Sequence, residues 1–148
     1  SSHVPVFARS VVIQAPADVV FAFHEREDAL ALLSPAFPPV RVLSREGGIR
    51  KGARVVLRVG ELRWVAVHTD YKKNRYFQDE QAEGPFKKWK HRHEFEQEGA
   101  GTRLTDRIEY ELPGGRLVNW LLRWPVSVGL GNMFRHRHRV TKSMCEQA

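Results

Sequence analysis

The feature that most constrains the fold is a pair of alternating segments joined by the turn Gly99-Ala100-Gly101. On each side of this turn, apolar or aromatic residues alternate with charged ones, the period of a β-strand with one solvated face. Symmetric pairing about the turn gives four inward pairs: Phe95 with Leu104, His93 with Asp106, His91 with Ile108, and Trp89 with Tyr110. The sequence therefore predicts a long hairpin whose inner face is aromatic and apolar except for His91, His93 and Asp106.

Similar alternation recurs along most of the chain. The expected strands cover residues 7–14, 40–45, 53–59, 62–71, 75–83, 86–97 and 102–112. Two short helices are expected between Pro16 and Leu33, and a long helix is expected from about Arg116 to Cys145, interrupted near Pro125. No repeat or linker divides this order, so we predict one α+β domain over residues 1–148, with a curved seven-stranded antiparallel sheet around a C-terminal helix.

A second hairpin separates an apolar face from a basic one. Across the turn Gly60-Glu61, Leu57 pairs with Trp64 on the predicted inner face. The outer face carries a stripe of basic residues: Arg54, Arg58, Arg63, Lys88, Lys90 and Arg92. A nucleic acid partner is disfavoured, because aromatic side chains for base stacking would have to share this outer face and they point inward instead.

The composition is that of a folded protein, with 42% hydrophobic and 28% charged residues. The net charge of +7 permits an anionic partner. Part of this charge is concentrated near the end of the chain, in Arg135, His136, Arg137, His138, Arg139 and Lys142. A solvated helix face is the favoured interpretation of this basic cluster. Docking to an anionic membrane surface or to nucleic acid is the alternative.

Cysteine usage and the termini bear on the cell compartment. A single cysteine, Cys145, leaves no internal disulfide framework, which favours a reducing compartment, and we expect a cytoplasmic protein. The opening Ser1-Ser2-His3 does not resemble a secretory signal. The most apolar stretch, residues 118–134, contains Arg, Asn, Pro and Gly residues and is not expected to span a membrane. The sequence predicts no oligomeric state.

An ordered set of residues across adjacent hairpins resembles the Bet v 1-like/START (SRPBCC) superfamily, in particular its bacterial cyclase/dehydrase-like and coenzyme Q-binding-like members. The residues that carry the resemblance are Phe77, Asp79, Gln81, Gly84-Pro85-Phe86, residues 89–95, Gly101-Thr102, Asp106, Tyr110 and Leu112-Pro113. The predicted order of elements agrees with this superfamily over nearly the whole chain. The resemblance implies a helix-grip fold with an internal ligand cavity, in proteins that bind lipids, isoprenoids such as quinones, or polyketide-like molecules.

The favoured function is non-catalytic binding or transport of a small hydrophobic or amphipathic molecule. Apolar contacts are expected from Leu57, Trp64, Phe77, Trp89, Tyr110, Met133 and Phe134. The polar residues His91, His93 and Asp106 would orient a polar end group, since burying them unpaired would cost on the order of 1 to 3 kcal/mol. A solid aromatic core without a cavity is the structural alternative.

Two chemical alternatives use the same polar residues. His93 and Asp106 could form an oriented general base for enolisation or dehydration of a ketide, as in cyclase/dehydratase-type enzymes, although no Ser or Cys nucleophile can be placed beside them. His91, His93 and Asp106 could also supply three ligands to Zn²⁺ or Fe²⁺. Because no fourth ligand is evident, we predict neither a metal nor another cofactor.

Overall fold

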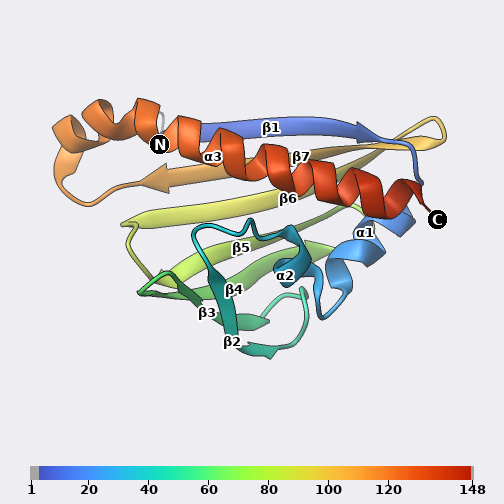
Figure 1. Ribbon diagram of the computed structural model, residues 1–148, viewed down its shortest axis with the longest axis horizontal. Helices are drawn as coiled ribbons and strands as arrows, with labels where there is room; N and C mark the ends of the chain where they lie inside the picture. Colours follow the sequence, from blue (N-terminus) through green and yellow to red (C-terminus); the bar gives the residue numbers. More distant parts are fainter. Residues whose placement is uncertain (1–3, 148) are drawn as a thin grey trace.

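The computed structural model describes residues 4–147, so the interpretation of Ser1-Ser2-His3 concerns residues outside the described part (Figure 1). The elements in chain order are β1 (Val6–Ile13), α1 (Ala17–Glu25), α2 (Ala29–Leu33), β2 (Val40–Glu46), β3 (Arg54–Val59), β4 (Leu62–Lys72), β5 (Tyr76–Glu83), β6 (Lys88–Glu98), β7 (Gly101–Glu111) and α3 (Gly115–Glu146). This is the predicted succession of one strand, two short helices, six strands and a long helix.

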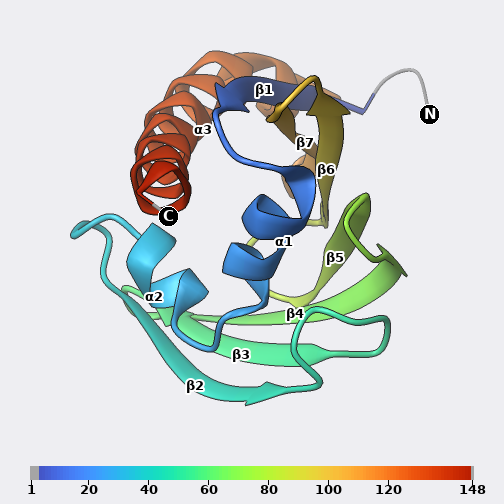
Figure 2. The ribbon, with the colours of Figure 1, turned by 90° about the vertical axis from the view of Figure 1, so that its right-hand side faces the viewer.

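The seven strands form one antiparallel sheet in the order β1-β7-β6-β5-β4-β3-β2. Figure 2 shows this sheet curving around α1 and α2. The long helix α3 lies along the open side of the curve and contacts β1, α1 and α2. The predicted α+β class, a curved antiparallel sheet around a C-terminal helix, is therefore confirmed.

The strand register agrees with the pairing expected about the two turns. Leu57 lies opposite Trp64, and His93 lies opposite Asp106. Gly60 and Gly99 both have positive φ, at 58° and 59°, a conformation that glycine adopts without steric cost. The hairpins could be predicted because glycine marked each turn and period-two alternation fixed each face.

The expected interruption of the last helix near Pro125 is wrong, because α3 runs through Pro125 without a break. Proline removes one N–H group and leaves one carbonyl without its helical partner. This part of α3 is open to solvent: Leu117, Trp120 and Trp124 are 67%, 59% and 72% exposed. Water can therefore satisfy the freed carbonyl. Within residues 4–147, no helix is both long and apolar enough to cross a membrane.

Two apolar clusters form the core and leave a polar stretch between them. In the first, the ring of Phe21 from α1 packs against Phe95 of β6. In the second, Phe134 of α3 joins Trp89 of β6 and Ile108 of β7. Along β6 and β7, the two histidines and Asp106 occupy the inward positions between these clusters. The alternation of the hairpin thus positions a buried polar group at the centre of the fold.

Candidate functional site

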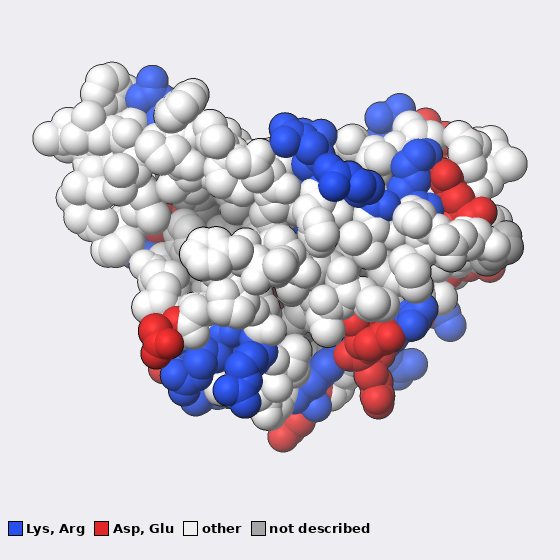
Figure 3. All heavy atoms as spheres, in the orientation of Figure 1, with Lys and Arg blue, Asp and Glu red and all other residues white. Residues whose placement is uncertain are grey.

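A cavity of about 320 Å³ lies between the sheet, α2 and α3. Most of its walls are apolar, and they come from strands β2 to β6 and from helices α2 and α3. Figure 3 shows a hollow on this face of the molecule, beside the N-terminal half of α3 and bordered mainly by uncharged side chains. This volume is at the lower end of the range for small-molecule sites. The interior is therefore not solidly packed.

Seven of the residues expected to contact a ligand line this cavity: Leu57, Trp64, Phe77, Trp89, His91, His93 and Met133. Three others lie behind its wall. Tyr110 and Phe134 belong to the adjoining apolar cluster, where both are buried. Asp106 is also buried, on the far side of the two histidines (relative exposure 3%). These three act on the cavity through its lining residues rather than by facing it.

Asp106 is the centre of a network of imidazoles. Its Oδ1 faces Nε2 of His91 at 2.7 Å and Nδ1 of His93 at 3.1 Å. Its Oδ2 accepts a hydrogen bond of 2.6 Å from Nε2 of His138 on α3. Burial alone would raise the pKa of Asp106, but its three imidazole partners hold this pKa well below the usual range. The carboxylate is thus charged and fixes the orientation of three rings.

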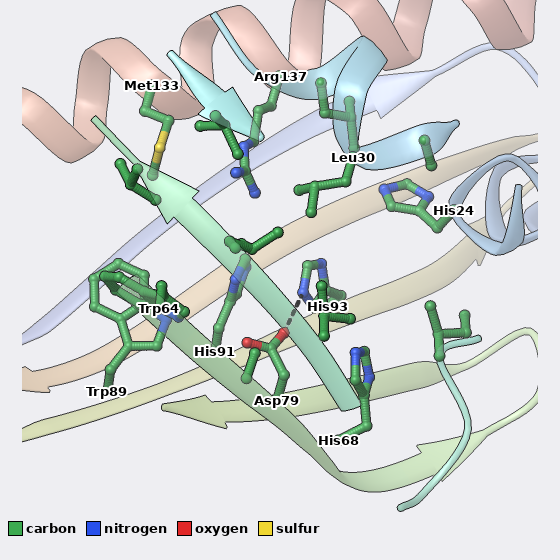
Figure 4. A pocket seen from close by; sticks show the side chains of 18 of the residues that line it. His24, Leu30, Trp64, His68, Asp79, Trp89, His91, His93, Met133 and Arg137 are labelled. Atoms are coloured by element: carbon green, nitrogen blue, oxygen red, sulfur yellow. Dashed lines mark hydrogen bonds and ion pairs between the residues drawn. The ribbon is translucent and has the colours of Figure 1, made fainter. Parts of the chain in front are cut away.

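His93 lies between two carboxylates. Its Nδ1 faces Asp106, and its Nε2 is 3.2 Å from Oδ2 of Asp79 on β5, the contact drawn in Figure 4. Burial alone would lower the pKa of His93, but hydrogen bonds to Asp106 and Asp79, together with their negative charges, raise it overall. A ring with an acceptor at each nitrogen is best satisfied as a cationic imidazolium.

The pKa of the neighbouring His91 shifts in the opposite direction. Burial lowers its pKa, the positive charge of His93 lowers it further, and the hydrogen bond to Asp106 offsets this only in part. The two rings stack with their centroids 3.7 Å apart. One wall of the cavity therefore presents a neutral imidazole next to a charged one.

The residues expected from the sequence to contact a ligand do not include five that lie in this region: His24, His68, Asp79, Arg137 and His138. The sequence could have indicated Asp79, because it lies two residues from the inward Phe77 on the same strand and therefore on the same face. It could also have indicated His138, which lies one helical turn after Phe134. The signals for the other three are weaker, because they depend on how α1, β4 and α3 pack together.

The basic cluster of α3 is divided between two environments. The expected solvated face holds for Arg135 and Arg139, which are exposed. Two other members face inward: His138 is 4% exposed, and Arg137 lines the cavity. The physical reason is helical periodicity, because positions one and two residues apart on a helix face different directions.

A metal ion would find its ligands in a different set from the one considered in the sequence. Asp79, His91 and His93 each offer a ligand atom, and these atoms lie within 4.8 Å of one another. However, both nitrogens of His93 already face carboxylates, so a cation would have to displace the contact between His93 and Asp79. Asp106 and His93 have partners for their oxygen and nitrogen atoms within the protein, and we continue to predict a site without metal.

A curved sheet gripping a helix over a partly apolar cavity defines a ligand-binding helix-grip protein. Residues 13–133 match the family model described as polyketide cyclase/dehydrase and lipid transport, and the chain belongs to this family. Among curated proteins, no sequence matches the chain. The resemblance to the Bet v 1-like/START superfamily is confirmed.

Solved structures share this fold at low sequence identity. Zhui aromatase/cyclase from Streptomyces sp. R1128 has a TM-score of 0.77 and 18% identity, over 98% of this chain and 95% of that one. A START superfamily protein from Mycobacterium smegmatis has a TM-score of 0.69 and 17% identity, over 96% and 97% of the two chains. The protein TTHA0849 from Thermus thermophilus has a TM-score of 0.71 and 22% identity, over 94% and 95%.

Proposed function

We propose that the protein binds a small amphipathic molecule in its cavity and carries it without chemical change. The observation that supports this proposal is the cavity of about 320 Å³, which has apolar walls and a polar group on one side. An apolar body would be removed from water there at a gain of about 25 cal/mol for each Å² buried. Family membership agrees with such a role but does not identify the ligand.

The two kinds of cavity wall suggest how the ligand would be oriented. Trp64 and Trp89 pack edge to face, with ring centroids 5.1 Å apart, and Met133 faces the cavity from α3 (Figure 4). These side chains suit an alkyl chain or a ring system. His91, whose Nε2 alone is engaged by Asp106, can bond a polar end group. The polar group is fixed by Asp106 before any ligand enters, so little ordering would be needed on binding.

A cavity-filling substitution tests this proposal. Ala66 lines the cavity from β4 and is 8% exposed, so Ala66→Phe places a ring in the space and leaves every polar side chain unsubstituted. We expect this variant to bind small amphipathic probes at least about tenfold more weakly than the wild type, because it removes much of the available volume. Isothermal titration calorimetry, with a fatty acid and a naphthalene derivative as probes, measures the loss.

Val6→Phe is the matched control for this test, because Val6 is 55% exposed on β1 and does not line the cavity. The control should bind as the wild type does. Equal binding by wild type and the folded Ala66→Phe variant would contradict the proposal, because the probes would then occupy another site.

A second candidate is a cyclase/dehydratase-type enzyme, favoured by the two adjacent histidines whose pKa values shift in opposite directions. In dehydration of a bound β-hydroxyketone, neutral His91 would accept the α-proton. Cationic His93 would give up its contact with Asp79 and donate the Nε2 proton to the departing hydroxyl, which leaves as water. The structure thus favours His93 as the acid rather than the expected base. Unchanged turnover by a folded His93→Gln variant would contradict this candidate.

A further inference from the structure

Arg137 occupies a place on α3 that helical periodicity would give to an apolar residue. Leu130, Met133 and Arg137 line the cavity from one face of the helix, spaced by three and four residues. In Figure 4 the guanidinium of Arg137 points from α3 into the cavity, on the same side as Met133. A permanently charged group therefore stands among apolar walls.

This guanidinium has no carboxylate partner in the part of the chain that the structure describes. Within residues 4–147, Arg137 forms no ion pair, and its buried Nε has no hydrogen-bond acceptor. The guanidinium lies over the ring of Phe134, whose centroid is 5.2 Å from Cζ. Leaving this buried N–H group without an acceptor is costly, and arginine cannot escape that cost by losing its proton.

The charges that line the cavity leave a positive surplus. The cationic side chains are Arg45, Arg137 and His93. The acidic ones are Asp79 in the lining and Asp106 directly behind His93, so one positive charge remains in surplus. Asp79 is already engaged by His93 at 3.2 Å, and Arg45 donates to the backbone carbonyl of Arg26 at 2.9 Å. Arg137 is the cation that remains available to a ligand. A cavity with this balance attracts an anion.

We propose that Arg137 binds a carboxylate head group, and that the ligand is an amphipathic organic acid with its apolar body among Trp64, Trp89 and Met133. This inference rests on the proposed function, since it names the chemical class of the molecule in the same cavity. A carboxylate suits the site because guanidinium binds it through two parallel hydrogen bonds. The neighbouring His91, whose Nε2 alone is engaged by Asp106, would bond a further polar atom of the head group.

The test compares acids with neutral molecules of the same shape. Decanoic acid is paired with decanol, and a naphthoic acid with the matching naphthalene methanol. Calorimetry at pH 8 measures their affinities for the whole protein. We expect the wild type to bind each acid at least about tenfold more tightly than its alcohol, as a charge-assisted hydrogen bond predicts. Arg137→Gln should lose this preference while keeping its affinity for the alcohols.

The control is Arg139→Gln, which removes the same charge from an exposed position two residues along α3. It should keep the preference for acids. Arg137→Lys retains the positive charge and should retain part of the preference, which provides a second variant if Arg137→Gln does not fold.

The results of this test distinguish the assignment of Arg137 from the proposed function. Equal affinity of the wild type for acid and alcohol would overturn the assignment of Arg137 and leave the proposed function intact. An equal loss of preference in Arg137→Gln and Arg139→Gln would also overturn it, because overall charge would then be responsible. Failure of every probe to bind the wild type would instead contradict the proposed function itself.

Discussion

His24 illustrates how burial of one side chain makes stability depend on pH. The ring is buried among Phe23, Phe77 and Phe95, and its Nδ1–H donates to the carbonyl of Val20 at 2.8 Å. Burial, assisted by the positive charge of His93, lowers the pKa of His24 from 6.5 to about 4. The folded protein therefore keeps this ring neutral where the unfolded chain would protonate it.

The free energy of unfolding should fall on acidification for this reason. The contribution of His24 is complete above pH 6.5, and it is lost as the pH falls toward 4, because unfolding takes up a proton in that interval. The loss is about 3 kcal/mol when both states are protonated. Urea denaturation of wild type and His24→Gln between pH 4 and 8 measures it, and the variant should show the shallower slope.

His136→Gln, on α3, controls for the removal of one histidine and should keep the wild-type slope. The same slope in wild type and His24→Gln would show that this ring is not held neutral by burial. The comparison uses slopes rather than absolute stabilities, so a change in overall stability caused by the substitution does not affect it.

At the residue scale, the sequence could predict the polar group only in part. The pair of His93 and Asp106 followed from alternation about one turn, because the neighbours in a hairpin are local in sequence. The contact of Asp106 with His138 joins residues 32 positions apart, and it depends on where α3 crosses the sheet. The position of Arg137 depends on the same crossing, which the helical pattern alone does not determine.

At the element scale, α3 combines two halves with different roles. Its C-terminal half is anchored by buried Phe134, His138, Thr141 and Cys145. Its N-terminal half is largely exposed and contains Pro125, which lacks the N–H for a helical hydrogen bond. The sequence correctly predicted the extent of this helix. The interruption expected near Pro125 is wrong, because the free-energy cost of a proline in a helix depends on whether solvent reaches the freed carbonyl.

Replacing this proline should stabilise the helix. Pro125→Ala restores a backbone donor, and proline in a helix interior costs up to about 3 kcal/mol relative to alanine. We expect the free energy of unfolding to rise by about 1 to 3 kcal/mol, as measured by urea denaturation. The neighbouring Ser127→Ala, also exposed, should change it by only a few tenths of a kcal/mol. A destabilised Pro125→Ala variant would mean that the ring of Pro125 makes a contact the helix needs.

For the molecule as a whole, the curved sheet could be predicted from the sequence, but the cavity volume could not. The succession of elements, the register of two hairpins and their inward faces followed from alternation, turn glycines and family resemblance. The cavity volume did not, because inward rings such as Trp64 and Trp89 can either fill a core or surround a space. That choice is made by the distances between α2, α3 and the sheet, and no local pattern encodes them.

A crystal structure of the protein grown with saturating decanoic acid would show whether the space under α3 holds an amphipathic molecule. We expect density for one decanoate in the cavity, with its carboxylate bonded to Arg137 and its chain beside Trp64 and Met133. A cavity closed by the surrounding side chains, or decanoate bound only on the outer surface, would contradict this expectation.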